Sequence, residues 1–122
     1  VFLTGLQGDQ PAANTLIKVA RVDPDLTLRV QALVAMRRSP VLGKNSRELV
    51  RLYDQSAERD VKRHLMGLYA RSQTPLAIGK LVAIVEHEKD PALRDHAIAL
   101  LGGERDPRVK EVLQKNSAGG AR

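Results

Sequence analysis

Apolar residues recur at intervals of three and four along most of the chain, which is the spacing of one buried face of an α-helix. The pattern is clearest in the stretches 16–20, 49–53 and 81–85. Each stretch is followed by five or six polar residues rich in Asp, Glu, Ser and Pro, and then by a second stretch of helical spacing. Such polar residues end one helix and cap the next. The pattern therefore predicts three helical hairpins.

The hairpins repeat at a nearly constant interval. Leu16, Leu49 and Leu81 are 33 and 32 residues apart, and the same intervals separate Arg29, Lys62 and Arg94. Prolines at 40, 75 and 107 stand between the units, where a proline suits a turn or a helix start. One hairpin cannot bury its apolar stripe alone, so neighbouring hairpins must stack. We predict repeat units over 13–38, 47–72 and 78–103.

The ends of the chain extend this organisation. Residues 1–8 begin apolar without a capping residue and are predicted to be the end of a truncated preceding helix in a longer chain. Residues 108–115, with Leu113 again 32 residues after Leu81, are predicted to form a capping helix. Residues 116–122 have no apolar periodicity and are predicted to be a flexible tail. The stretch 1–115 is thus predicted to be a single domain.

The turn and second helix of the first unit resemble a known family. Residues 23–33 are similar to the inter-helix turn and second helix of bacterial HEAT repeats, also called phycobilisome-lyase-type HEAT-like repeats, and 89–97 repeat the match with its Asp-Pro pair. The middle unit, 56–62, lacks the proline and has Lys62 where the others have arginine. The resemblance covers roughly residues 13–115. It implies an all-α, right-handed α-α superhelix, a HEAT-like solenoid of about three hairpins with partial terminal units.

Composition agrees with close-packed helices. Hydrophobic residues make up 43% of the chain, with two tyrosines, one phenylalanine and no tryptophan. This predicts a core of small and aliphatic side chains without aromatic rings, and argues against a β-sandwich. The absence of cysteine excludes disulfides and thiolate metal sites. No apolar stretch approaches the roughly 18 to 20 residues of a membrane-spanning helix, so no membrane insertion is predicted. The cytoplasm is the default expectation for such a chain, and the periplasm is also compatible with it.

An acid stands four residues before a base at the start of each predicted second helix. These pairs are Asp25 and Arg29, Glu58 and Lys62, and Asp90 and Arg94. The acid suits the positive end of a helix, and the base can pair within or between units. We favour this structural ladder over a row of anion-binding cations. Accordingly, Arg94→Ala is expected to loosen the stacking before it harms binding.

Candidate catalytic and metal-binding residues are few. His64 and His96 occupy the same position in consecutive second helices and could face each other, but Asp95 and Arg63 beside them do not complete a ligand set. The chain also has no serine elbow, no glycine-rich phosphate loop and no metalloprotease histidine pair. DNA glycosylases built of HEAT-like repeats use aromatic and acidic groups in a cleft, and this chain has no tryptophan. We predict neither an enzyme nor a metal or cofactor site.

Positive charge is the remaining lead to function. The net charge is +6, which favours anionic partners. The resemblance implies that second helices line the concave face. If Leu28, Ala32 and Met36 point inward, that face carries Arg37, Arg38, Arg63 and Arg71 above a floor of alanines and glycines. We predict a non-catalytic scaffold that binds an acidic segment of a partner protein there. One alternative is nucleic-acid backbone binding. Single strands would need stacking aromatic side chains, which are nearly absent, so this alternative is a duplex backbone. The other alternative is a face that is merely solvated.

Overall fold

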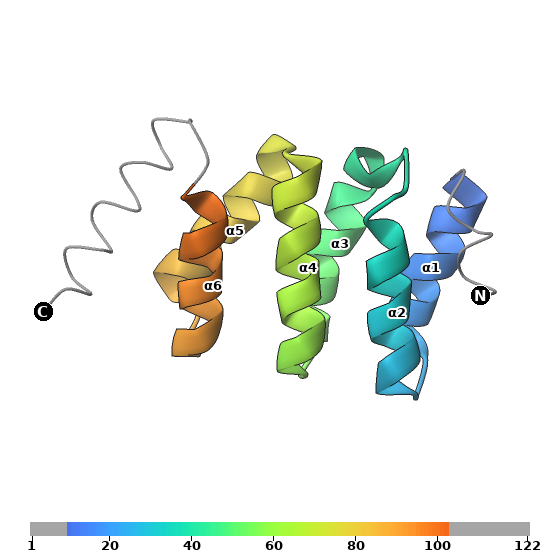
Figure 1. Cartoon of the computed structure of the whole chain (residues 1–122), viewed down its shortest axis with the longest axis horizontal. Coiled ribbons are helices and arrows are strands. Elements are labelled where there is room, and N and C mark those ends of the chain that lie inside the picture. Colours follow the sequence, from blue (N-terminus) through green and yellow to red (C-terminus); the bar gives the residue numbers. More distant parts are fainter. Residues whose placement is uncertain (1–9, 103–122) are drawn as a thin grey trace, which may run out of the picture.

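A computed structural model describes residues 10–102 of the chain and shows an all-α fold in this range (Figure 1). The helices are α1 (Gln10–Val22), α2 (Leu26–Met36), α3 (Ser46–Gln55), α4 (Arg59–Ser72), α5 (Pro75–His87) and α6 (Pro91–Leu101), and a short 3-10 turn, η2 (Leu42–Asn45), precedes α3. The described residues contain no strand. The predictions for 1–8, 108–115 and 116–122, and for the last residue of the unit 78–103, lie outside the described residues.

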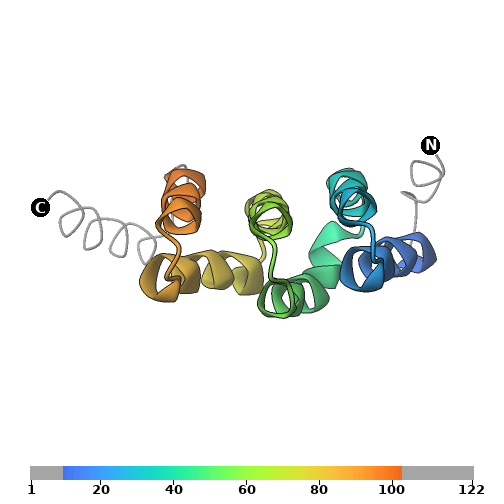
Figure 2. The same ribbon diagram turned by 90° about the horizontal axis from the view of Figure 1, so that it is seen from below.

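The helices form two layers. Helices α1, α3 and α5 make up one layer, and α2, α4 and α6 make up the other (Figure 2). Each odd-numbered helix packs against the even-numbered helix that follows it, and α4 also contacts α2, α5 and α6. The turns within the hairpins lie at the lower edge of Figure 1, whereas the loops between hairpins lie at its upper edge. This arrangement places residues of equivalent turns side by side.

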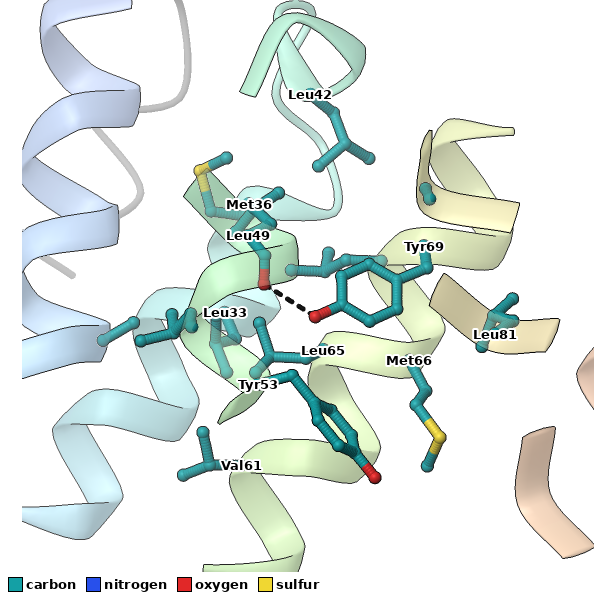
Figure 3. Packing of buried hydrophobic residues seen from close by; sticks show 14 of the residues in the cluster. Leu33, Met36, Leu42, Leu49, Tyr53, Val61, Leu65, Met66, Tyr69 and Leu81 are labelled. Atoms are coloured by element: carbon teal, nitrogen blue, oxygen red, sulfur yellow. Dashed lines mark hydrogen bonds between the residues drawn. The ribbon is translucent and has the colours of Figure 1, made fainter. Parts of the chain in front are cut away.

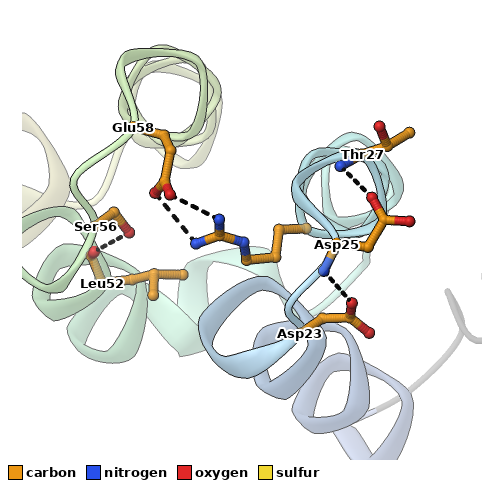
Figure 4. Close-up of polar contacts among 7 residues, drawn as sticks. Asp23, Asp25, Thr27, Leu52, Ser56 and Glu58 are labelled. Atoms are coloured by element: carbon orange, nitrogen blue, oxygen red, sulfur yellow. Dashed lines mark hydrogen bonds and ion pairs between the residues drawn. The ribbon is translucent and has the colours of Figure 1, made fainter.

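Local capping explains where α2 and α6 begin. The Asp25 carboxylate accepts a hydrogen bond of 2.9 Å from the Thr27 N–H (Figure 4), and Asp90 accepts one of 3.0 Å from the Ala92 N–H. Each bond satisfies a helix N–H that has no partner within the helix. At its C-terminal end, α4 is capped by Gln73, whose backbone is in the left-handed region (φ 54).

The core runs along the whole array between the two layers. Buried leucines recur in every helix, namely Leu16, Leu33, Leu49, Leu52, Leu65, Leu68, Leu81, Leu93 and Leu101. Figure 3 shows the packing of Leu33, Leu49 and Leu65 in the middle of this core. Burial of one such side chain stabilises the fold by about 1.5–3 kcal/mol. Both tyrosines also lie in the core, which corrects the expectation of a core without aromatic rings. The Tyr69 hydroxyl donates to the Leu49 carbonyl oxygen at 2.6 Å, so burial of the ring leaves no unpaired hydroxyl.

The inward face of α2 differs from the expected one. Ala32 and Met36 are buried as predicted, but Leu28 is 39% exposed. The buried stripe of α2 instead continues through Leu33 and toward the largely shielded Arg29, so Leu28 lies on the flank of the helix. The difference arises because α2 packs between α1 and α4, and this contact favours the face that bears Leu33.

Within residues 10–102, no helix has the length and apolar character needed to cross a membrane.

Candidate functional site

An ion pair joins the first hairpin to the second. The Arg29 guanidinium donates to both carboxylate oxygens of Glu58, at 2.8 and 3.2 Å (Figure 4). This hydrogen bond is the main cause of a raised pKa for Arg29 and a lowered pKa for Glu58. The Arg29 Nε is shielded from solvent and has no hydrogen-bond partner among the described residues. The two charges are therefore held in one arrangement across the hairpin boundary.

A second ion pair joins the second hairpin to the third. The Arg59 Nε donates to Asp90 at 2.8 Å, while the other Asp90 oxygen caps α6. Burial of the Asp90 carboxyl opposes its ionisation, but hydrogen bonds from Arg59 and from the Ala92 N–H outweigh burial and lower the pKa. The predicted ladder residues Glu58 and Asp90 thus each contact an arginine of the preceding hairpin.

The other predicted ladder bases lie elsewhere. Lys62 lies over the ring of Tyr53, with its Nζ 5.1 Å from the ring centroid. Arg94 is exposed and forms no ion pair within the described range. Among the described residues, the structure therefore shows no ion pair of Arg94 whose loss in Arg94→Ala would loosen the stacking of the hairpins. Sequence spacing missed the role of Arg59 because the i to i+4 pattern relates residues of one helix, whereas these ion pairs connect different hairpins.

Tyr53 is the centre of a polar cluster, which we call the Tyr53 cluster and which also contains Lys62, Lys80 and Glu88. The Lys80 Nζ lies 4.9 Å from the ring centroid and forms an ion pair of 2.9 Å with Asp54. The Tyr53 hydroxyl donates to Glu88, and burial followed by this bond raises the Tyr53 pKa. The cluster connects α3, α4 and α5 to the turn before α6, which is a structural role.

The paired histidines are neighbours on α4 and α6. Burial is the main cause of a lowered pKa for His96, and the positive charges of Arg63 and His64 lower it further. Within residues 10–102, no three His, Cys, Asp or Glu side chains are grouped so that they could hold a metal ion. The geometry around His96 thus disfavours its protonated form.

Three of the four predicted partner-binding arginines gather at one place. Arg37, Arg38 and Arg71 line a surface depression of about 370 Å³ at the C-terminal ends of α2 and α4, and we call this depression the arginine notch. The Arg71 Nε donates to the Arg37 carbonyl oxygen, which orients the Arg71 guanidinium. Arg63 does not line the notch. It stands eight residues before Arg71 on the same helix, about 12 Å away along the axis.

A second depression adjoins the arginine notch. It measures about 600 Å³, and Gly43 lines both depressions. Lys44, Arg47, Pro75 and Leu76 contribute to its walls. The Leu76 side chain is 48% exposed, which is high for a large aliphatic residue. We call this depression the Leu76 pocket. The sequence did not indicate it, because its walls come from the starts of two odd-numbered helices, α3 and α5.

The exposed side of the even-numbered helices is low and of mixed charge. The exposed residues of these helices include Val34 on α2, Asp60 and Arg63 on α4, and Asp95 and Ala99 on α6. A Cβ added at Gly67 would meet no atom within 4 Å, so space is open above this residue. We call this surface the even-helix face.

Comparison of the chain with models of protein families, with curated proteins and with solved structures finds no match.

Proposed function

We propose that the chain is a HEAT-like solenoid that acts as a non-catalytic scaffold and holds a segment of a partner protein on the even-helix face. The supporting observation for the architecture is the two-layer packing of hairpins with equivalent turns at one edge. In this proposal the hairpins are HEAT-like repeats and their right-handed stacking makes α2, α4 and α6 the concave side.

The observation that carries the binding role is the openness of the even-helix face. Gly67 and Ala99 keep its surface low, so a partner backbone can approach the helices closely. Val34 is 44% exposed and supplies apolar contact, while Asp60, Arg63 and Asp95 supply charges of both signs. A surface of this kind suits an extended or helical polypeptide, because it has apolar area and polar groups that fix orientation.

The proposal includes no chemical step. The polar side chains with the clearest contacts are engaged in helix caps, in ion pairs between hairpins and in the Tyr53 cluster. These contacts hold the fold together. A binding role uses the outer surface, which these contacts leave free.

A second candidate function is binding to a nucleic-acid backbone. The observation that favours it is the arginine notch, since guanidinium groups bind phosphate oxygens through paired hydrogen bonds. Such binding weakens steeply as salt increases, because each phosphate contact releases counterions. This candidate function would be ruled out if a DNA duplex did not bind, or if its binding did not depend on salt concentration.

The scaffold proposal can be tested by site-specific photo-cross-linking. A cross-linking side chain placed at Gln31 or at Ala99, both exposed on the even-numbered helices, is expected to give a discrete adduct in an extract of the source cells. Matched control positions are Lys18 and Glu86, which are exposed on the opposite layer. Adducts of equal yield from the control positions, or none from Gln31 and Ala99, would contradict the proposal.

A further inference from the structure

Charge is distributed unequally between the two edges of the array. Acids lie in or beside the turns at the lower edge of Figure 1, namely Asp23, Asp25, Asp54, Glu58, Asp60, Glu86, Glu88 and Asp90. The upper edge, formed by the ends of α2 and α4 and the starts of α3 and α5, carries the cations Arg37, Arg38, Lys44, Arg47 and Arg71. Glu48 is the acid found among the described residues of that edge. The upper edge is thus a concentrated positive surface.

The cations of the two edges also differ in their partners. At the lower edge, Arg29 and Arg59 each hold a carboxylate at 2.8 Å. Among the described residues, Arg37, Arg38 and Arg71 form no ion pair, although all of them line the same depression. Like charges gathered in this way repel one another, and an anion placed between them relieves that repulsion. The arginine notch therefore has unused capacity for carboxylate or phosphate groups.

The Leu76 pocket adds a contact of a different kind. It continues from the arginine notch past Gly43 and presents the exposed Leu76 side chain together with Pro75. A ligand that lies along both depressions meets guanidinium groups at one end and an aliphatic surface at the other. Burial of that aliphatic surface contributes about 25 cal/mol per Å² of apolar area.

We propose that the arginine notch and the Leu76 pocket form one docking groove for a short acidic polypeptide segment that carries an aliphatic side chain. Carboxylates of the segment pair with Arg37, Arg38 and Arg71, and the aliphatic side chain packs on Leu76 and Pro75. The proposal rests on the scaffold function above and deepens it, because it names the chemistry of the partner and a contact surface outside the even-helix face.

Two observations favour a polypeptide over a nucleic acid. Tyr53 and Tyr69 are 4% and 1% exposed, so neither ring can stack on a base. Stacking on aromatic side chains is a main source of affinity for single strands. The exposed Leu76 contributes nothing to a sugar-phosphate backbone, whereas it matches an aliphatic side chain of a peptide. Nucleic acid is therefore an outcome that the test must be able to reveal.

The test uses fluorescence anisotropy with three labelled probes. The first is a short peptide of glutamates with one central leucine, the second has serine in place of that leucine, and the third is a short DNA duplex. The variants are Arg37→Glu/Arg38→Glu and Leu76→Ser, because these side chains are exposed or line the groove and their loss leaves the core intact. The control is Lys18→Glu/Arg51→Glu, which changes the net charge equally at exposed positions that lie outside the groove and outside the even-helix face.

We expect the leucine peptide to bind best, and the Arg37→Glu/Arg38→Glu variant to weaken it by about tenfold or more. Leu76→Ser is expected to weaken the leucine peptide several-fold and to leave the serine peptide unchanged. In nuclear magnetic resonance spectra, addition of the leucine peptide should change the amide chemical shifts of residues 37–48 and 71–76. Circular dichroism checks that the variants remain folded.

Several outcomes would contradict the proposal of a docking groove. These are no binding of the leucine peptide, equal binding of both peptides and the duplex, or an equal loss in the charge control. Shifts confined to 60–67 and 92–99 would also overturn it, because they lie on the even-helix face. None of these results removes the scaffold proposal, since cross-linking from Gln31 and Ala99 tests that proposal separately.

Discussion

Arg29 of α2 and Glu58 at the start of α4 form a bidentate ion pair across the boundary between the first two hairpins. The same relationship returns one hairpin later between Arg59 and Asp90. These contacts fix how far one hairpin is displaced along its neighbour, because a shift along the helix axis would break both hydrogen bonds of the first pair. We therefore expect the ion pairs to contribute to the register of the hairpins, because hydrogen bonds between charged groups are directional and apolar contacts are not.

The first prediction concerns this ion pair. Arg29→Gln should lower the free energy of unfolding. The substitution removes both hydrogen bonds to Glu58, and the shorter glutamine side chain packs less apolar surface than the arginine stem does. Arg94→Gln is the matched control on α6 and should change stability by less than about 0.5 kcal/mol, because Arg94 is exposed and forms no ion pair within the described range. Urea denaturation of the two variants measures the difference. A larger loss in Arg94→Gln would contradict the assignment.

The Glu58 pKa makes a related prediction about acid. Because the folded-state pKa of Glu58 is lowered, its contribution to stability is present above the ordinary glutamate pKa of 4.5 and is lost as pH falls through the folded-state value. Wild type should therefore lose more stability below about pH 4.5 than Arg29→Gln does. Denaturation curves of both proteins at several pH values between neutral and acid measure this. Parallel pH profiles would show that Arg29 does not hold the carboxylate ionised.

The third prediction separates buried from exposed leucines. Leu65 is fully shielded from solvent, so Leu65→Ala should destabilise the fold by about 2–5 kcal/mol through lost contacts and a cavity. Leu28 is 39% exposed, so Leu28→Ala should cost less than about 1 kcal/mol. Thermal and urea unfolding of both variants decide the matter. Equal losses of stability in the two variants would indicate that Leu28 is buried on the inward face of α2, as its sequence spacing predicts.

The fourth prediction concerns the buried hydroxyl of Tyr69. Tyr69→Phe keeps the ring but removes the hydrogen bond to the Leu49 carbonyl oxygen, which should cost about 1 kcal/mol. Leu49 and Tyr69 lie on α3 and α4, so the loss should also speed amide hydrogen exchange in both helices. Unchanged stability and exchange would mean that the ring alone supplies the contribution of Tyr69.

The last prediction concerns His96. Its folded-state pKa lies below the ordinary 6.5, so its contribution to stability is present above pH 6.5 and is lost as pH falls through the lower folded-state value. Removing one positive neighbour by Arg63→Gln should raise the His96 pKa part of the way back, since burial is the larger cause. Titration of the imidazole signals by nuclear magnetic resonance measures both values. A His96 pKa at or above 6.5 in wild type would contradict the arrangement.

Much of the local structure could be read from the sequence. The polar stretches that were predicted to end one helix and cap the next contain the observed caps Asp25 and Asp90, and Pro75 stands in the first turn of α5. The leucines used to set the spacing, Leu16, Leu49 and Leu81, are all buried. These features are predictable because helix periodicity and capping depend on residues within a few positions of one another.

The candidate site could be predicted only in part. Arg37, Arg38 and Arg71 were singled out with Arg63, but spacing along a helix could not show that the first three share a depression and that Arg63 does not. The Leu76 pocket was missed because the residues that form it come from two different hairpins. The partners of Glu58 and Asp90 were missed for the same reason.

The sequence by itself determined the all-α character, the approximate limits of the helices and the residues that cap them, because each depends on short-range backbone and side-chain chemistry. Only the tertiary structure decided which leucine of α2 is buried, which arginine meets which carboxylate, and which cations gather at the upper edge. These outcomes depend on how each helix is rotated and displaced against its neighbours. That choice is made by contacts between hairpins that lie about thirty residues apart in the sequence.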